Sequence, residues 1–493
     1  MSAVLDSAAA PAAAAEAPSA ATPSHDRKWL GLTVVLAATL LNLLDASIVN
    51  IAAPAIQADL GASYSALQWT AAAYTLTLAA GLLTGGRLGD IFGRKRMMAI
   101  GIVAFVTASV LCAVAWSPEA LIAARVLQGL AGAVMIPQGF GLLRDMFPPH
   151  EIGKAFALFG PAIGLATILG PIVAGTLVDA DLFGTGWRMI FLINVPIGLF
   201  ALLAGRVALP AKPPVAHDKS LDLLGLTIGG AGMFMLVYPL VQGQEKGWPA
   251  WMFGMLAAAV AVLAGFVAYT LRRTRLGVKA PIVQLSVFTK RSYSSGVLFV
   301  IVFFGTITGL SMAIGLFLQF GLGFSAMRAS LTMAPWAVGA FIGSGASGAL
   351  MGKLGRKILH IGLTIMAVGI AGLYAVFANA STDLGSWTMA GPFLVFGLGM
   401  GMIFVPLFDI IMGEVADEEV GSASSSLESM QQLAAALGVA VFGTVFFSQG
   451  GAHLHQQSAL DAVATTALIA LVLTVVAFAV GFLLPKHARQ GGH

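Results

Sequence analysis

Long apolar runs separated by short polar breaks fill the chain from residue 29 to residue 484. Each run is 20–27 residues long, and a helix needs roughly 20 residues to cross the hydrocarbon core of a membrane. A membrane-spanning strand would need about half that length and strict alternation of apolar and polar positions. The pattern therefore predicts fourteen transmembrane helices. We place them at residues 29–53, 66–85, 97–116, 119–143, 153–178, 187–208, 221–241, 249–271, 293–318, 326–350, 358–378, 386–412, 421–447 and 460–484.

The composition agrees with this pattern and excludes two other classes of protein. Hydrophobic residues make up 58% of the chain and charged residues 10%, against about 25% charged residues in a soluble domain. The single cysteine, Cys112, lies in an apolar run, so the chain is not a disulfide scaffold. Residues 1–28 are rich in Ala, Pro and Ser and lack the basic start and apolar core of a signal peptide. We expect them to form a disordered cytoplasmic tail.

The positive charges are unevenly divided between the two sets of loops. If the N-terminus is cytoplasmic, all but four of the 26 Lys and Arg residues fall on the cytoplasmic side; the four are Arg125, Arg188, Lys246 and Arg328. Cytoplasmic loops of membrane proteins carry such an excess. We therefore expect a protein of the cell (inner) membrane with both termini in the cytoplasm. The net charge of +4 then reflects contacts with membrane lipids, and no nucleic-acid partner is expected.

An internal repeat divides the predicted helices into two sets. Residues Gly86–Lys95 and Gly348–Lys357 share Gly, Leu, Gly, Arg and Lys at a constant offset of 262 residues. Each segment follows the second helix of a six-helix block if the seventh and eighth helices are an insertion, which gives a 6+2+6 arrangement. Repeated halves with a substrate path between them are typical of secondary transporters.

The repeat also sets the expected domain boundaries. We predict an N-terminal six-helix bundle at 29–208, a linker with two inserted helices at 209–280, a C-terminal six-helix bundle at 281–485 and a cytoplasmic tail at 486–493. The inserted helices either separate the two halves or face lipid.

Several short motifs identify a family that the chain resembles. They are the loop segment Gly86–Arg96, the helix 1 segment Leu44–Pro54, the helix 4 segment Arg125–Gly129 with Pro137, the helix 5 residues Gly164, Gly170, Pro171 and Gly175, and the segment Trp187–Gly198. The chain resembles the major facilitator superfamily, and within it the fourteen-helix drug:proton antiporters. The resemblance implies an all-α polytopic membrane protein. One departure is Ala174, where the helix 5 motif usually has glycine.

The loop motif has a direct physical interpretation. Gly86, Gly89 and Gly93 have no side chains to prevent close helix contact. Asp90 is expected either near a helix N-terminus, where the dipole favours a carboxylate, or paired with a neighbouring arginine such as Arg94. Such contacts would hold one conformation and release in another. The alternative for residues 94–96 is that their positive charges only anchor the loop to anionic lipid.

Two charges are predicted deep inside the membrane. Asp45 lies about 16 residues from the inner end of its helix, and a carboxylate at that depth is costly unless it is paired, hydrated or protonated. Arg125 lies at a similar level. The resemblance places both helices beside the central cavity, so we expect the two side chains to interact directly or through water. The pair would then load and release a proton; the alternative is a static ion pair that fixes helix packing.

The thirteenth predicted helix carries a polar stripe. Glu428, Gln431 and Gln432 share one face at spacings of three and four residues. A carboxylate on such a face suits a proton or a cationic substrate, and the resemblance implies that relatives often have an amide there. The alternative is a protonated Glu428 bonded to its neighbours. Asp409 is predicted either to bind a cation or to reach the membrane interface.

The resemblance also implies a substrate cavity. Its expected residues are Asn50, Trp69, Tyr74, Gln128, Gln319 and Gln431. Trp69 and Tyr74 suit stacking on aromatic or cationic substrates, although interface anchoring competes for Trp69. Gln319 has a helix-end role as its alternative. Gly164, Gly170 and Gly175 permit close helix contact and Pro171 bends helix 5, which suits alternating access, although glycine is also common in any membrane helix.

No enzyme motif is present. The sequence lacks a Gly-x-x-x-x-Gly-Lys-Ser/Thr loop and a His-Glu-x-x-His pair, and His453 with His455 is a weak metal signal. We therefore expect no cofactor, no metal and no enzymatic activity. The leading hypothesis is a monomeric, proton-coupled exporter of lipophilic, cationic drug-like compounds. The alternatives are export of one antibiotic or endogenous metabolite, nutrient uptake, and a polytopic enzyme or channel.

Overall fold

The structure is a computed structural model and is described for most of the chain. The described residues are 25–147, 151, 170, 172–181, 184–211, 222–276, 285–380, 384–415, 420–450 and 456–485. Within these ranges the regular secondary structure is helical. The α-helices are α1 (His25–Leu60), α2 (Tyr64–Phe92), α3 (Arg94–Ala113), α4 (Pro118–Met146), α6 (Met189–Leu192), α7 (Asn194–Ala208), α8 (Leu223–Lys246), α9 (Ala250–Arg275), α10 (Arg291–Leu316), α11 (Ala326–Leu354), α12 (Lys357–Ala378), α13 (Ser386–Met412), α14 (Val420–Gly450) and α15 (Gln456–Gly481). The short elements are η2 (Gly186–Arg188), η3 (Leu285–Thr289) and the π-turn η4 (Phe317–Gly321).

The helices confirm the all-α prediction. Eleven helices in the described ranges are long and apolar enough to cross a membrane, or twelve if the two parts of the bent helix α2 form one span. Of the other two predicted spans, 326–350 lies in α11. The span 153–178 falls mostly outside the described residues, and only Gly170 and residues 172–178 of it are seen to be helical.

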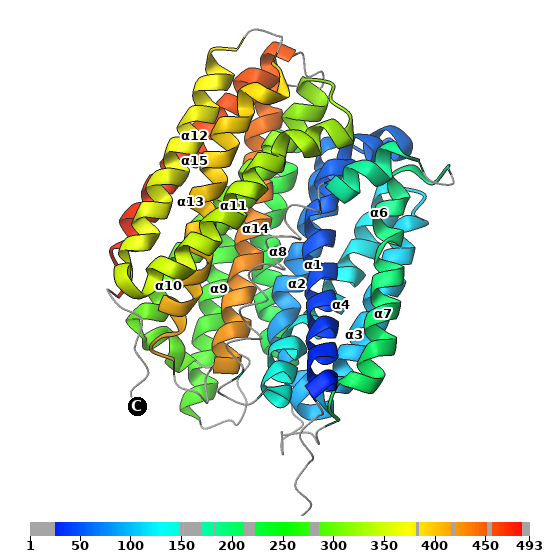
Figure 1. Ribbon diagram of the computed structural model, residues 1–493, viewed down its shortest axis with the longest axis vertical. Helices are drawn as coiled ribbons and strands as arrows, with labels where there is room; N and C mark the ends of the chain where they lie inside the picture. The colour runs from blue at the N-terminus through cyan, green and yellow to red at the C-terminus, as the bar shows by residue number, and fades with distance from the viewer. Residues whose placement is uncertain are drawn as a thin grey trace, which may run out of the picture.

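The helices form two bundles that lie side by side (Figure 1). In one bundle α2 packs on α4, α3 on α4 and α1 on α7, while in the other α11 packs on α13, α12 on α13 and α10 on α14. The bundles meet mainly where α2 contacts α14 and where α1 contacts α10. Figure 1 also shows α1 starting and α15 ending toward the lower end of the view.

The two helices that the sequence predicts to be an insertion have different surroundings. Helix α8 packs against α2 of one bundle and α14 of the other, and Thr444 of α14 donates a hydrogen bond of 2.6 Å to the Leu240 carbonyl of α8. Helix α9 packs on α8, and only 11% of its apolar segment is buried. Helix α8 therefore covers the seam between the bundles, whereas α9 presents most of its surface outward.

Close helix contact within each bundle depends on glycine. A Cβ added at Gly85 of α2 would lie 1.9 Å from the Ala133 carbonyl oxygen of α4. In the other bundle, a Cβ at Gly401 of α13 would lie 2.0 Å from the Ala340 carbonyl oxygen of α11. Real atoms do not approach so closely, so these crossings exist because the side chain is missing.

The repeated segment is helical, and the prediction of a loop there was wrong. Helix α2 continues through Phe92, and Gly93 alone separates it from α3. In the second copy Gly355 follows α11 in the same way. Both glycines have positive φ, 91° and 49°, a region that residues with a Cβ rarely adopt. The repeat is therefore a sharp helix-to-helix corner that occurs once in each bundle.

A cation after each corner binds the end of another helix in its own bundle. Lys95 donates to the carbonyls of Arg206 and Leu209 at 2.8 and 2.7 Å. Arg356 donates to the carbonyls of Phe482, at 2.8 Å, and Leu484. The last carbonyls of a helix lack partners within the helix and carry the negative end of its dipole. The start of α3 is thus bonded to the end of α7, and the start of α12 to the end of α15.

Candidate functional site

A buried ion pair lies inside the N-terminal bundle. The side chains of Asp45 on α1 and Arg125 on α4 are both 0% exposed, and Arg125 Nη1 donates to Asp45 Oδ2. Arg125 Nε also donates to the Thr70 carbonyl at 2.9 Å, and Nη1 donates to Gln128 Oε1 at 2.8 Å. The sequence prediction that Asp45 and Arg125 interact is confirmed, and the interaction is direct.

Two amides complete the environment of Asp45. Gln128 Nε2 and Asn194 Nδ2 donate to Asp45 Oδ1 at 2.7 and 3.0 Å, and both nitrogens also donate to Ser109 Oγ at 2.7 and 3.0 Å. The two carboxylate oxygens therefore accept three hydrogen bonds from neighbouring side chains. These hydrogen bonds and the pairing with Arg125 offset part of the cost of burying the carboxylate.

Tyr74 packs against the Asp45–Arg125 pair. Its ring lies 4.2 Å from the guanidinium carbon of Arg125, and its hydroxyl donates to Asn42 Oδ1. The side chain is fully buried. Tyr74 and Gln128 were predicted as cavity residues, and the structure places both against the ion pair. Asn42, Ser109 and Asn194 were not predicted as its partners, although Asn194 lies in the family motif Trp187–Gly198.

Glu428 lies on α14, at the seam between the bundles. Its side chain is partly exposed, Gln432 Nε2 donates to its Oε1 at 3.1 Å, and it makes no ion pair within the described part of the chain. The next residue, Ser429, donates to the Ala79 carbonyl of α2. The hydrogen bond from Gln432 confirms the polar face that the spacing predicted.

The other predicted polar residues are spread over both bundles. Gln431 is partly buried, and its Oε1 has no hydrogen-bond partner among the residues described. Gln319 is buried in the π-turn η4, where its Nε2 donates to the Gly315 carbonyl at 3.3 Å. Asp409 is exposed on α13. Asn50 lies in α1, and its side chain is outside the described part.

Trp69 faces the inserted helices. Its ring centroid lies 6.0 Å from that of Phe234 and 6.1 Å from that of Tyr238, both on α8. The structure therefore separates Trp69 from Tyr74, which were predicted together as a stacking surface.

The corner motif connects three helices. Arg94 pairs with Asp90 at 3.3 Å and with Asp145 of α4 at 3.5 Å. A Cβ at Gly89 would lie 1.8 Å from Gln138 Oε1 of α4, and one at Gly86 would lie 3.4 Å from a Ser425 side-chain oxygen on α14. The motif thus lies where α2 contacts both its own bundle and the other one.

The helix 5 motif is only partly within the described residues. Gly164 and Pro171 lie outside them, while Gly170 is helical and buried. A Cβ at Gly175 would lie 2.8 Å from the Ala326 carbonyl oxygen and the Met327 backbone of α11.

The same segment makes a polar contact with the first turn of α11. Asp179 Oδ2 accepts a hydrogen bond from the Met327 backbone N–H at 3.0 Å, and a carboxylate is favourable at a helix N-terminus. We call this contact and that of Gly175 the 175–179 contact. It joins the two bundles at the end remote from the start of α1.

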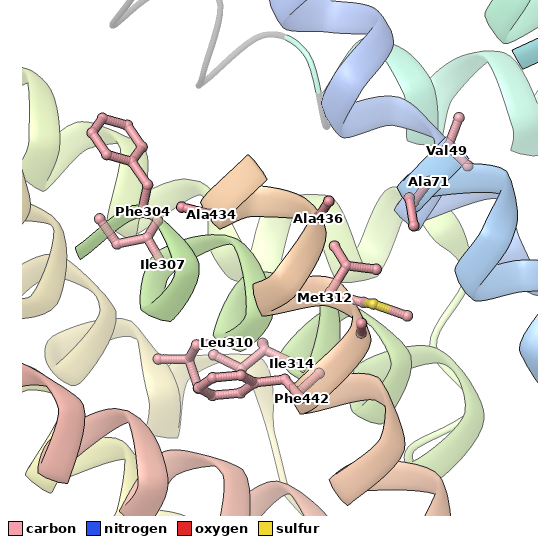
Figure 2. Close-up of a cluster of buried hydrophobic side chains, with 14 of the residues drawn as sticks. Val49, Ala71, Phe304, Ile307, Leu310, Met312, Ile314, Ala434, Ala436 and Phe442 are labelled. Atoms are coloured by element: carbon pink, nitrogen blue, oxygen red, sulfur yellow. The ribbon is translucent and has the colours of Figure 1, made fainter. Parts of the chain in front are cut away.

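Apolar side chains fill the seam near the same end. Figure 2 shows Met312 of α10 and Ala436 of α14 on one side, with Val49 of α1 and Ala71 of α2 on the other. All four are buried in one hydrophobic cluster. Together with the 175–179 contact, this packing closes the seam on that side of the membrane.

Two apposed helical bundles with a repeated corner motif define a transporter-like polytopic membrane protein. Residues 35–439 match the Major Facilitator Superfamily, and the chain belongs to this family.

Similar proteins include several from Streptomyces. The chain is 49% identical to the "Probable actinorhodin transporter" of Streptomyces coelicolor, over 88% of this chain and 75% of that protein. It is 35% identical to the "Tetracenomycin C resistance and export protein" of Streptomyces glaucescens, over 86% and 77%. It is 33% identical to the puromycin resistance protein of Streptomyces alboniger, over 93% and 90%.

Solved structures share the fold. A peptide transporter in complex with sulfate matches with a TM-score of 0.65 and 15% identity, over 92% of this chain and 95% of that one. The xylose transporter XylE from E. coli matches with a TM-score of 0.60 and 15% identity, over 91% and 97%.

Proposed function

We propose that this protein exports lipophilic, antibiotic-like compounds across the cell membrane in exchange for protons, by alternating access. The observation that carries the proposal is Glu428, a carboxylate inside the membrane region at the seam of two bundles, with an amide partner and no ion pair in the described residues. A carboxylate in this setting gains and loses its charge as its surroundings change. The names of the antibiotic-exporting and resistance relatives support the direction and class of cargo.

The proposed topology is fourteen helices in a 6+2+6 arrangement with both termini cytoplasmic. Twelve candidate spans, α11 and the 172–179 segment supply the fourteen. The uneven distribution of Lys and Arg supports the orientation, as does the position of both described ends at one end of the molecule. The conformation described is then closed toward the outside by the 175–179 contact and the apolar seam.

The two intramembrane carboxylates take different parts in the proposed cycle. Asp45 is already paired with Arg125 and bonded to two amides in this conformation, which favours Glu428 as the group that loads the proton. Proton binding and cargo binding each favour one of two conformations, which couples them energetically. Each proton that enters contributes about 2.3 kcal/mol per 100 mV of membrane potential, in addition to the pH gradient. A static role for Asp45 and Arg125 in helix packing is compatible with this cycle.

Everted membrane vesicles provide the test. An acid interior drives uptake of a fluorescent probe, with ethidium as a cation and Nile red as a neutral compound. We expect Glu428→Gln to reduce proton-driven uptake at least tenfold while the protein still binds the probe. The matched control is Asp461→Asn, which also replaces a carboxylate by its amide but at an exposed position of α15. Undiminished pH-driven uptake by Glu428→Gln would overturn the coupling role, and uptake of Nile red alone would overturn the cationic cargo.

A narrower cargo range is a second candidate, because each of the three Streptomyces relatives is named for one antibiotic. A panel of chemically unrelated probes in the same vesicles distinguishes the two. Transport of one scaffold only would establish a dedicated exporter.

A further inference from the structure

Helix α8 is deeply buried in its second half and not at its start. Val237 and Val241 are 0% and 1% exposed and belong to the hydrophobic cluster that fills the seam. Leu223 and Leu224, the first two residues of the helix, are 61% and 58% exposed. The second half of α8 is therefore inserted at the seam, whereas the start of the helix lies at the surface.

The buried half of α8 is hydrogen-bonded to both bundles. Gln242 Nε2 donates to Ser65 Oγ of α2 at 3.4 Å, and the Leu240 carbonyl accepts the 2.6 Å bond from Thr444 of α14. Ser65 lies in the first turn of α2, soon after the end of α1. The two bonds therefore join the bundles at the end of the seam remote from the start of α1. The proposed topology places this end outside, and we call it the outer end.

Helices α2 and α14 are in direct contact at the same end. The ring of Tyr64 on α2 stacks on that of Phe447 on α14, with centroids 4.3 Å apart. Nearby, a Cβ at Gly443 of α14 would lie 2.6 Å from Gln68 Nε2 of α2. Helix α8 thus lies across a joint that is closed in this conformation, and its two bonds add to the contacts that keep it closed.

Helix α8 has neighbours in the N-terminal bundle along most of its length. In the buried half, Phe234 and Tyr238 lie against Trp69 of α2. In the first half, Gly230 lines a groove whose other wall is formed by α2 and α4. The hydrogen bond to the C-terminal bundle is instead made by Thr444, near the end of α14. Separation of the bundles at the outer end would therefore leave α8 more of its contacts if it stayed with α2.

We propose that α8 is a strap that holds the outer ends of the two bundles together. When the outer end opens, α8 stays on α2 and releases α14 at the bond between Thr444 and the Leu240 carbonyl. Alternating access moves one bundle against the other largely as a rigid body, so a helix bonded to both opposes that motion. The strap rests on the alternating access of the proposed function and needs no contact with the cargo.

Distances between two spin labels test the strap without transport. Trp116 and Trp387 follow α3 and α12, the helices that begin at the two corners, and are 81% and 90% exposed. Both are replaced by cysteine in the Cys112→Ser chain, labelled with a nitroxide and measured in nanodiscs by pulsed electron resonance. We expect Thr444→Val to raise the ratio of long to short distances roughly two- to tenfold, the net effect of one hydrogen bond. Thr444→Ser, which keeps the hydroxyl, should retain the original ratio.

A matched variant controls for the loss of a threonine hydroxyl. Thr364 of α12 donates at 2.8 Å to the His360 carbonyl of its own helix, so Thr364→Val should leave the distances unchanged. Unchanged distances in a folded Thr444→Val protein, or an equal change in Thr364→Val, would overturn the strap.

Cross-linking tests which bundle α8 follows. In the Cys112→Ser chain, one variant carries Leu240→Cys with Thr444→Cys and another carries Ser65→Cys with Gln242→Cys. A short bis-methanethiosulfonate joins each pair, and dithiothreitol reverses the link. We expect the link to α14 to abolish proton-driven probe uptake in vesicles until it is reduced, and the link to α2 to leave at least half of the uptake. Any other pattern would overturn the assignment of α8 to α2.

The two experiments also separate the strap from the export function. The spin-label distances need neither a gradient nor a cargo. A protein that takes up no probe, but in which Thr444→Val lengthens the distances, contradicts the export function alone.

Discussion

The two bundles differ in how they hold polar groups inside the membrane. In the N-terminal bundle, Asp45 and Arg125 are fully buried and surrounded by hydrogen-bonding amides. The interior of the C-terminal bundle is rich in phenylalanine, with Phe303 and Phe404 in edge contact, and Glu428 stands at its seam without an ion pair in the described residues. One half thus carries a buried ion pair, and the other carries a single acid with an amide partner.

The repeated corner shows the same asymmetry. In the first copy Arg94 binds the carboxylates of Asp90 and Asp145. In the second copy the position equivalent to Asp90 is Gly352, and Arg356 binds backbone carbonyls instead. The glycine that both copies share forms the corner. The ion pairs of Arg94 with Asp90 and Asp145 occur at the N-terminal corner only, among the described residues.

The largest effect is expected from breaking the buried pair. Arg125→Met leaves Asp45 buried without its cation, which typically costs about 3–5 kcal/mol, so we expect a much lower melting temperature in detergent and little folded protein. Combining it with Asp45→Asn should recover part of the loss, since no uncompensated charge remains. Arg328→Met, at an exposed arginine of the other bundle, is the control. Equal stability of wild type and Arg125→Met would show that the pair contributes nothing to the fold.

The variant Glu428→Gln should distinguish effects on folding stability from effects on proton coupling. Because Glu428 has an amide partner and no ion pair in the described residues, its neutral replacement should change the free energy of unfolding by less than about 1 kcal/mol. The same variant should lose proton-driven uptake. The melting temperature and vesicle uptake, measured on one preparation, check both. A collapse of stability comparable to that of Arg125→Met would remove the distinction between the bundles.

The contact between the bundles gives a third prediction. Gly175→Val places atoms where the Ala326 carbonyl and the Met327 backbone already lie, so it should open the outer side. Val49→Cys, introduced with Cys112→Ser, reports this by its reaction with a membrane-impermeant maleimide. We expect the rate to rise several-fold with Gly175→Val. Gly391→Val on α13, where the space is open, should leave the rate unchanged, and an equal rise there would argue against a specific contact.

The smallest effect is expected where α1 ends in the N-terminal bundle. Hydrogen bonds from Arg188 and Trp187 lower the pKa of Asp59 below its usual 3.8. The pair therefore contributes its full stability above the ordinary pKa and loses it as the pH falls through the lowered one. Because the pair is partly exposed, Asp59→Asn should cost only about 0–1 kcal/mol at pH 7. Melting temperatures at pH 7 and pH 3 should show the difference shrinking in acid.

The features that the sequence predicts well share a physical cause. The membrane spans can be predicted because an apolar run of about 20 residues matches the length of a transmembrane helix. The contact of Asp45 with Arg125 can be predicted because an unpaired charge is costly in a membrane. Asn42, Ser109 and Asn194 give no such signal, since uncharged polar residues are tolerated in many helices. The sequence does not predict the 175–179 contact either, because nothing distinguishes Asp179 from an ordinary loop residue.

Helix ends were the weakest predictions. Gly86 and Gly89 suggested a loop, yet packing against α4 keeps both in α2, and only Gly93 breaks the helix. Trp69 suggested a cavity or an interface, but its neighbours are on an inserted helix that no local pattern connects to it. Contacts between distant segments of this kind depend on the assembled fold.

The inserted hairpin has a consequence for how such a chain arises in evolution. Each membrane crossing reverses the side on which the following segment begins, so a single added helix would turn the second half upside down. Helices α8 and α9 together restore the original side, and the second bundle keeps the orientation of the first. An insertion of this kind would therefore be tolerated only as a pair of helices, and α8 of this pair lies across the seam between the two bundles.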